Sequence, residues 1–168
     1  IYLRINANEA KHGCGLALIN NADAQIVKTV ISGNKSSIGS GYGGGIYSVD
    51  SDPHLTNATI TGNTAKFGPA IFTTAAQATT INWTLRNCIF WANGEYYGDD
   101  SPQVEFDNSG GMNNFQIHYS LLQNGIEDGI ENYDNGVVTH SHMMEGSPLF
   151  VSPIYPIWNS DPNAEGDF

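Results

Sequence analysis

Acidic side chains in the second half of the chain are the first candidates for a functional site. Four of them fall between positions 99 and 107, namely Asp99, Asp100, Glu105 and Asp107. Carboxylate oxygens are ligands that Ca²⁺ prefers, so this cluster predicts a weak calcium site. No complete loop signature of a calcium-binding motif accompanies it, and acids that only solvate the surface are the favoured explanation of the cluster. Apart from calcium, the sequence predicts no cofactor.

The same carboxylates raise the question of glycoside hydrolysis. That reaction needs two carboxyl groups about 5–9.5 Å apart across the scissile bond. Asp99 to Asp107 offer such pairs, as do Asp50 and Asp52. The surrounding sequences, however, are typical of turns, in which Asp accepts hydrogen bonds from nearby backbone amides. The structural interpretation is therefore favoured, and no residue is predicted to be catalytic.

Aromatic residues give a third candidate chemistry, which is stacking on sugar rings. The residues considered for this role are Trp83, Trp91, Tyr96, Tyr97, Tyr155 and Trp158. Most tryptophans of a small β-protein lie in its core or close its ends, so glycans are only a secondary expected partner. The two cysteines, Cys14 and Cys88, are too few for a disulfide framework and are predicted to pack as buried thiols.

Composition and charge exclude two classes of function. The 168 residues carry a net charge of −11, which excludes a nucleic-acid binder that works by neutralising phosphates. No apolar run approaches the roughly 18 residues of a membrane span. All six Lys and Arg lie in residues 1–86 with four acids (6 − 4 = +2), and the other 13 acids (17 − 4) follow without a cation. One end of the molecule is therefore expected to be near neutral and the other anionic.

An internal repeat of about 30 residues indicates the fold. One motif recurs in residues 26–34, 55–63, 85–93 and 117–125, and a second motif precedes the copies at 13–18, 43–47, 68–72 and 103–106. Each motif is a short run of alternating apolar residues, which is typical of a strand. One repeat cannot bury its own apolar face, so the copies must stack.

The repeats predict an all-β, right-handed, single-stranded parallel β-helix of about four to five rungs. The interval lacks the 10–15-residue helices of an α/β fold and is shorter than the roughly 40–45 residues of a propeller blade. We expect the rungs in residues 1–151, and a tail or partial extra strand that packs on the helix end in 152–168. Strand edges at the two ends can be left without caps.

Asparagine recurs at one corner of the predicted coil. Gly33-Asn34 and Gly62-Asn63 follow the second strand of their repeats, and both residue types tolerate the left-handed backbone that a sharp corner needs. The predicted turn glycines are Gly33, Gly45 and Gly62. The predicted ladder of stacked side chains consists of Asn34, Asn63, Asn93 and Asn124. The alternative is that these are ordinary loop asparagines.

Two segments carry a resemblance to a known group. Gly43-Gly-Gly-Ile-Tyr47 and Leu55-Thr-Asn-Ala-Thr-Ile-Thr-Gly-Asn-Thr-Ala65 resemble repeats of bacterial right-handed parallel β-helix surface proteins, which include polymorphic outer-membrane adhesins and proteins of the pectin-lyase-like superfamily. The phrase Ser147-Pro-Leu-Phe-Val151 looks like the one that closes such arrays. The resemblance implies an extracellular or cell-surface location. It leaves function open, because that superfamily contains lyases, hydrolases and inert scaffolds.

The expected function is a non-catalytic, structural or adhesive module, a scaffold or spacer of a larger bacterial surface protein. One alternative is a subunit of an extracellular filament whose copies join end to end. Another is a carbohydrate-active enzyme. Arg86 is the only cation near the acidic half, and it is predicted to be a surface residue and not the base of a lyase. The expected partners are the rest of the same polypeptide or identical subunits, and neither nucleic acid nor a membrane.

Overall fold

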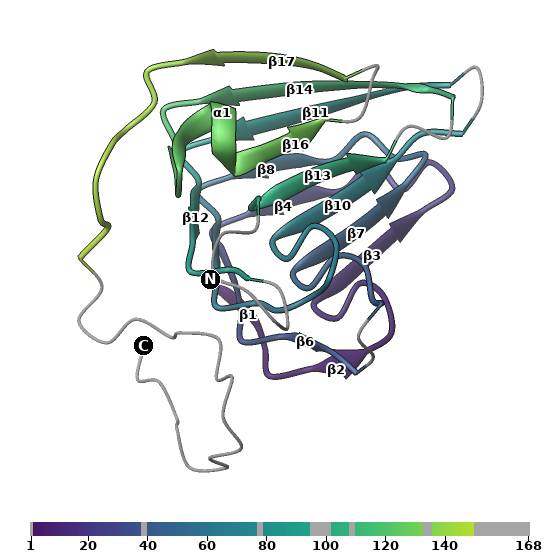
Figure 1. Cartoon of the computed structure of the whole chain (residues 1–168), viewed down its shortest axis with the longest axis horizontal. Helices are drawn as coiled ribbons and strands as arrows, with labels where there is room; N and C mark the ends of the chain where they lie inside the picture. The colour runs from purple at the N-terminus through teal and green to yellow at the C-terminus, as the bar shows by residue number, and fades with distance from the viewer. Residues whose placement is uncertain are drawn as a thin grey trace.

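The structure, a computed structural model, describes residues 2–37, 40–76, 79–94, 102–107, 110–132 and 136–149. The chain forms a parallel β-solenoid of about four turns (Figure 1). Each turn adds one strand to each of three five-stranded parallel sheets, here called sheets I, II and III. The predicted all-β fold of stacked parallel rungs is therefore confirmed.

Sheet I leads into the corner of the coil at which Asn34, Asn63 and Asn93 lie. Its strands, in spatial order, are β1 (Leu3–Asn6), β5 (Thr29–Ser32), β9 (Thr59–Thr61), β12 (Ile89–Trp91) and β15 (Leu121–Leu122). Ile31, Ile60 and Phe90 occupy equivalent positions in three successive turns and are completely buried. A column of like side chains thus fills this side of the core.

Sheet II follows the glycine-rich motifs. Its strands are β3 (Leu16–Ile19), β7 (Ile46–Val49), β10 (Ile71–Thr74), β13 (Val104–Asp107) and β16 (Ile130–Asn132). Ile46, Ile71 and Val104 align in register and point into the core. Because side chains alternate along a strand, the residues that follow them point outward.

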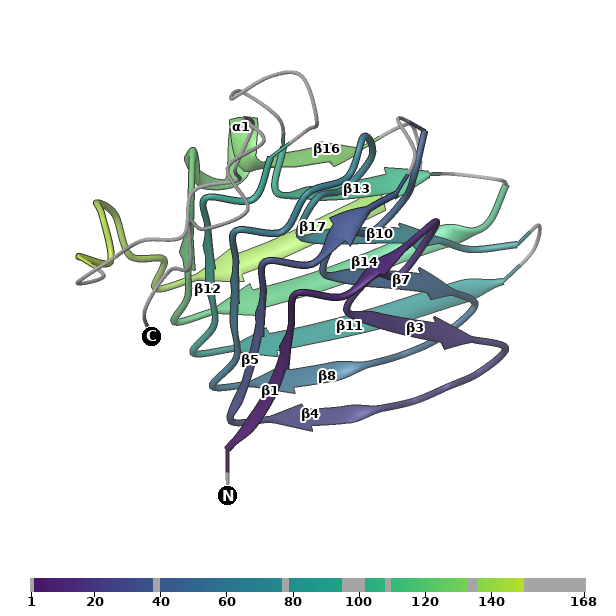
Figure 2. The same ribbon diagram turned by 90° about the horizontal axis from the view of Figure 1, so that it is seen from below.

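Sheet III has the longest strands. They are β4 (Gln25–Val27), β8 (His54–Thr56), β11 (Thr80–Arg86), β14 (Met112–His118) and β17 (Gly136–Ser141). Figure 2 shows β4, β8, β11 and β14 as successive layers. Two short strands, β2 (Glu9–Ala10) and β6 (Lys35–Ser36), pair beside sheet I, and one short helix, α1 (Gly125–Gly129), lies between β15 and β16.

The strand register matches the sequence repeat. Ile26 pairs with Leu55, Leu55 with Leu85, and Leu85 with Ile117, so the four copies of the first motif lie one above another. Each copy nevertheless forms two strands and not one, because a residue with positive φ turns the chain between sheets III and I. The corner residues are Lys28, Asn57, Asn87 and Tyr119.

The core is a stack of large apolar side chains inside the coil. Its largest fully buried members include Trp83, Phe90, Phe106 and Phe115. Among the described residues, no helix is long and apolar enough to span a membrane. The predicted tail, residues 152–168, lies outside the described residues, so its expected packing on the helix end stays a prediction.

Candidate functional site

The asparagines that follow sheet I form a continuous hydrogen-bonded ladder. The side-chain amide of Asn34 donates to Oδ1 of Asn63, and that of Asn63 donates to Oδ1 of Asn93, each over 2.9 Å. The backbone N–H groups of Asn34 and Asn63 donate to the same two oxygens over 3.0 Å. All three side chains are buried. The stacked arrangement, and not the loop alternative, is therefore what these three residues adopt.

The second hydrogen of each amide holds the backbone of the preceding turn. Asn34 donates to the carbonyl of Ile5, Asn63 to that of Ile31 and Asn93 to that of Ile60. The ladder thus gives hydrogen-bond partners to backbone groups of successive turns at the corner that follows sheet I, and buried polar groups are costly when they are left unpaired.

The ladder ends differently from the prediction. At one end the side-chain amide of Asn8 donates to Oδ1 of Asn34 over 2.9 Å. At the other end Asn93 donates to Oε1 of Gln103, whose own amide donates to the Asn93 carbonyl, each over 2.9 Å. Asn124 is not a rung of the ladder. It is exposed, has a φ of 68° and precedes α1, because the chain leaves the corner there to form a helix.

The three predicted turn glycines serve two different purposes. Gly33 and Gly62 have φ values of 60° and 63° and form the left-handed corner before the ladder residues. Gly45 does not belong to this class, and the positive φ of its motif falls on Gly43. A Cβ atom on Gly45 would lie 2.6 Å from the carbonyl oxygen of Ala70. Gly45 is therefore needed for close approach between two turns.

The carboxylates proposed for hydrolysis hold backbone amides of neighbouring turns. One oxygen of Asp50 accepts from the N–H of Ala76 over 2.7 Å, and one oxygen of Asp52 accepts from the N–H of Asn82 over 2.6 Å. The N–H of Asp52 itself donates to Asp23 over 3.1 Å. These contacts match the turn interpretation, in which Asp side chains act as local backbone acceptors.

The predicted calcium cluster is only partly described. Asp99 and Asp100 lie outside the described residues. Glu105 and Asp107 both point outward from β13, and Oε2 of Glu105, although on the outer face, is buried and accepts from the N–H of Gly68 over 2.9 Å. Within the part of the chain that the structure describes, no group of three His, Cys, Asp or Glu residues is placed to hold a metal ion.

A cluster of aromatic rings covers the outer side of sheet II, and we call it the outer aromatic cluster. It consists of His12, Tyr42, Tyr47, Phe67 and Phe72. His12, Tyr42 and Phe67 form one column through parallel bridges, and Tyr47 and Phe72 form a second column on β7 and β10. The rings of Tyr42 and Phe67 stack with centroids 4.8 Å apart, and Tyr42 meets Phe72 edge-on at 4.6 Å.

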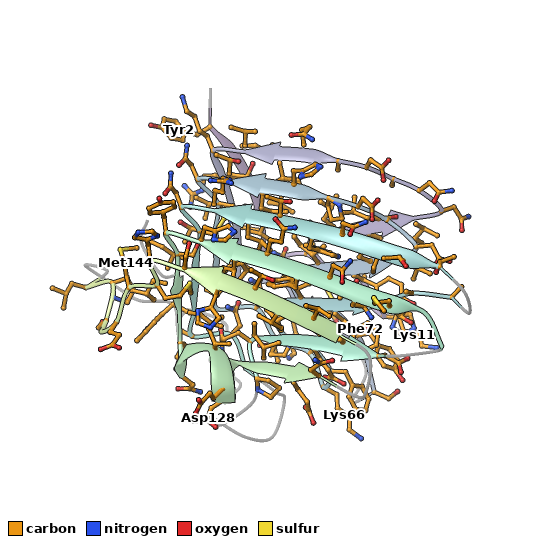
Figure 3. The ribbon with its side chains drawn as sticks, turned by 90° about the horizontal axis from the view of Figure 1, so that it is seen from above. Tyr2, Lys11, Lys66, Phe72, Asp128 and Met144 are labelled. Atoms are coloured by element: carbon orange, nitrogen blue, oxygen red, sulfur yellow. The ribbon has the colours of Figure 1, made fainter. Side chains whose placement is uncertain are left out.

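Charged groups flank the cluster. The ammonium of Lys66 lies 5.0 Å from the centroid of Phe67, and Figure 3 shows Lys11, Lys66 and Phe72 on the same side of the molecule. Burial raises the pKa of the Tyr47 phenol, and Tyr42 and Asp107 raise it further. Burial, together with Lys11, lowers the pKa of His12, whose Nδ1 accepts from the Tyr42 N–H over 3.3 Å.

Among the described residues, none of the aromatic side chains considered for sugar stacking belongs to this cluster. Trp83 is completely buried in the core and Trp91 is half-buried on β12, while Tyr96, Tyr97, Tyr155 and Trp158 lie outside the described residues. The outer aromatic cluster was missed, although the repeat contained its signal. Tyr47 and Phe72 each follow an inward isoleucine in the same motif, and alternation therefore directs both rings outward.

Both cysteines are buried and free, as predicted for packing thiols. Cys88 lies in the core, where burial raises its pKa to about 11. Its backbone N–H donates to the hydroxyl of Ser120 in the next turn over 3.0 Å.

Comparisons with protein-family models, with curated proteins and with solved structures found no match to this chain.

Proposed function

We propose that this chain is a non-catalytic structural module of an extracellular or cell-surface protein, and that it acts as a scaffold with an adhesive outer surface. One observation carries the proposal. Asp50 and Asp52, a carboxylate pair considered for hydrolysis, instead hold backbone amides of the neighbouring turn, just as the ladder residues Asn34, Asn63 and Asn93 hold the backbone at their own corner.

The chemistry of these contacts supports a structural role. One oxygen of Asp50 and one of Asp52 each accept from a backbone amide of the following turn, which fixes the carboxylate against the coil. The composition, poor in lysine and rich in acids, suits an extracellular protein, and the location is part of the proposal.

A turnover assay tests the non-catalytic part. The full chain is incubated with neutral and acidic polysaccharides, with and without millimolar Ca²⁺, and new reducing ends and unsaturated products are measured. We expect no signal above a protein-free blank, either for the chain or for the matched double variant Asp50→Asn, Asp52→Asn. Product formation by the chain would overturn the proposal in favour of the carbohydrate-active enzyme, and its loss in the variant would assign the activity to Asp50 and Asp52.

A second candidate function is end-to-end assembly, and the sheet edges favour it. At one end of the coil β1, β3 and β4 each pair on one side only among the described strands, and β16 and β17 do so at the other end. Such parallel edges offer unpaired backbone groups to a further coil, supplied by the same polypeptide or by a second copy. Exposed acids near the second end, Glu127 and Asp128, would attract the exposed Lys28 near the first end.

Sedimentation at increasing protein concentration tests this candidate. Assembly predicts that the particle size increases with protein concentration and decreases in high salt. It should also decrease in a Leu3→Lys variant, because Leu3 lies on edge strand β1 and is 53% exposed. The control Met112→Lys, on interior strand β14, should assemble like the parent chain. A single monomer boundary at every concentration would exclude self-assembly.

A further inference from the structure

We propose that the outer aromatic cluster is a binding site for an uncharged glycan that lies along the solenoid axis. The inference rests on the proposed function, since it assigns the adhesive surface of that module. The cluster spans three turns through two bridges, His12 to Tyr42 and Tyr42 to Phe67, and is therefore an extended surface and not an isolated ring.

The rings form one contiguous apolar surface with a buried base and a partly exposed outer side. Phe72 is only 2% exposed and forms its base, and the rings of His12, Tyr42, Tyr47 and Phe67 are half-buried, so part of each reaches solvent. Tyr47 and Phe72 are nearly parallel, with 15° between their planes and 5.8 Å between their centroids. Rings fixed by their neighbours lose little conformational entropy when a ligand binds, which favours recognition by apolar contact with the exposed parts of the rings.

The geometry of the sheet favours a sugar over a peptide. An extended peptide commonly binds a sheet by adding a strand to its edge, where backbone groups are unpaired. Here β7 and β10 lie inside sheet II and pair on both sides, so their backbone offers no such edge. A ligand must therefore bind through side chains, and the apolar C–H face of a pyranose ring fits an aromatic surface.

The polar rim matches hydroxyl groups and not a charged chain. Lys11 and Lys66, both exposed, flank the column of His12, Tyr42 and Phe67, and exposed Asp107 lies within electrostatic reach of Tyr47. The rim thus offers both donors and acceptors, as sugar hydroxyls require. The rim itself carries two lysines, but a long polyanion would also meet the 13 acids of residues 87–168, which repel it.

The spacing of the rings sets the direction of the ligand. Successive turns of a parallel solenoid are about 4.8 Å apart, so equivalent side chains repeat at that distance. This repeat is comparable to the length of one sugar residue in an extended glycan. A chain of pyranose rings parallel to the solenoid axis would therefore meet one aromatic residue of a column at each turn.

Affinity electrophoresis of the full chain in native gels tests the inference, with xyloglucan, galactomannan or mixed-linkage β-glucan cast in the gel. At least one should retard the chain. Tyr47→Ala should weaken the retardation at least tenfold, whereas Tyr47→Phe, which keeps the ring, should largely restore it. The control Tyr2→Ala, which removes an 81% exposed tyrosine outside the cluster, should bind like the parent chain.

Each other outcome has a distinct meaning. No retardation in any uncharged polysaccharide overturns the inference, and so does retardation that Tyr47→Ala leaves unchanged. Binding only to an acidic polysaccharide, or only to an immobilised peptide library, also overturns it. Hydrolysis of a retained glycan would instead refute the non-catalytic function while the binding site stands. Absence of both binding and hydrolysis removes the glycan site and leaves the structural module intact.

Discussion

Asn63 and Asn93 are joined by two hydrogen bonds that converge on one oxygen. Oδ1 of Asn93 accepts from the side-chain amide of Asn63 over 2.9 Å and from its backbone N–H over 3.0 Å. The remaining amide hydrogen of Asn63 bonds to the carbonyl of Ile31 over 2.9 Å. A single buried side chain thus connects three successive turns of the coil, and its loss would leave donors and acceptors of two neighbours unpaired.

Replacement of the central ladder residue should therefore be costly. We expect Asn63→Ala to lower the free energy of unfolding by about 3–5 kcal/mol, because it removes several buried hydrogen bonds and leaves polar groups without partners. Urea titration followed by circular dichroism measures the change. The matched control is Asn82→Ala, since Asn82 is exposed and accepts one bond, from Asn114, over 2.9 Å. An effect of Asn63→Ala no larger than the control would show that the ladder adds little.

The glycines of the coil should separate into two classes on substitution. Gly33→Ala places a side chain at a φ of 60° where no atom lies within 4 Å of the new Cβ, so we expect a loss of about 1–2 kcal/mol. Gly45→Ala places Cβ 2.6 Å from the Ala70 oxygen and 2.9 Å from Ile60, so we expect about 3 kcal/mol or more. Thermal melting of both variants checks the order, and equal losses would contradict the assignment.

Alkaline pH should destabilise the chain through Cys88. Its pKa is about 11 in the folded chain against a usual value of 9.0, because burial disfavours the thiolate. A group whose pKa is raised on folding contributes stability below its unfolded pKa and loses it as the pH rises. We therefore expect stability to fall between about pH 9 and pH 11, and to fall less in Cys88→Ala. Ala58, the equivalent residue of the preceding turn, shows that alanine fits this position. Parallel pH profiles of the two chains would refute the role of this thiol.

Calcium is expected to bind weakly through the outward carboxylates of β13. Oε2 of Glu105 already accepts from Gly68, which leaves Asp107 as the more available of the two described side chains. The calcium prediction requires that millimolar Ca²⁺ raise the melting temperature, that EDTA reverse the rise, and that Asp107→Asn reduce it. An unchanged melting temperature in the parent chain would eliminate the site.

The repeat made the strand register predictable. Leu55, Leu85 and Ile117 are the apolar residues that start each copy, and stacking them was the one arrangement that buried every copy on the next. The ladder was predictable from Asn34 as far as Asn93, because these asparagines recur at the same spacing as the stacked strands. The contact that ends the ladder, from Asn93 to Gln103, was not predictable, because Gln103 belongs to a different motif of the repeat.

Other features depend on contacts that no periodic pattern contains. Asn124 occupies the ladder position by spacing, yet α1 starts immediately after it and carries it to the surface. Gly45 resembles a corner glycine, but its conformation has no positive φ and the carbonyl of Ala70 is what restricts it. In the outer aromatic cluster, alternation predicts the outward column of Tyr47 and Phe72, but not its contact with the neighbouring column of Tyr42 and Phe67.

The claim that the asparagine ladder holds successive turns together is best tested by a double-mutant cycle on Asn34 and Asn63. These two side chains hydrogen-bond to each other between neighbouring turns. The free energy of unfolding is measured for the parent chain, for Asn34→Ala, for Asn63→Ala and for the double variant. Direct coupling predicts that the double variant loses at least about 1 kcal/mol less than the sum of the single losses. Losses that add within about 0.5 kcal/mol would show that the two asparagines act independently and would contradict the ladder as the element that holds the coils together.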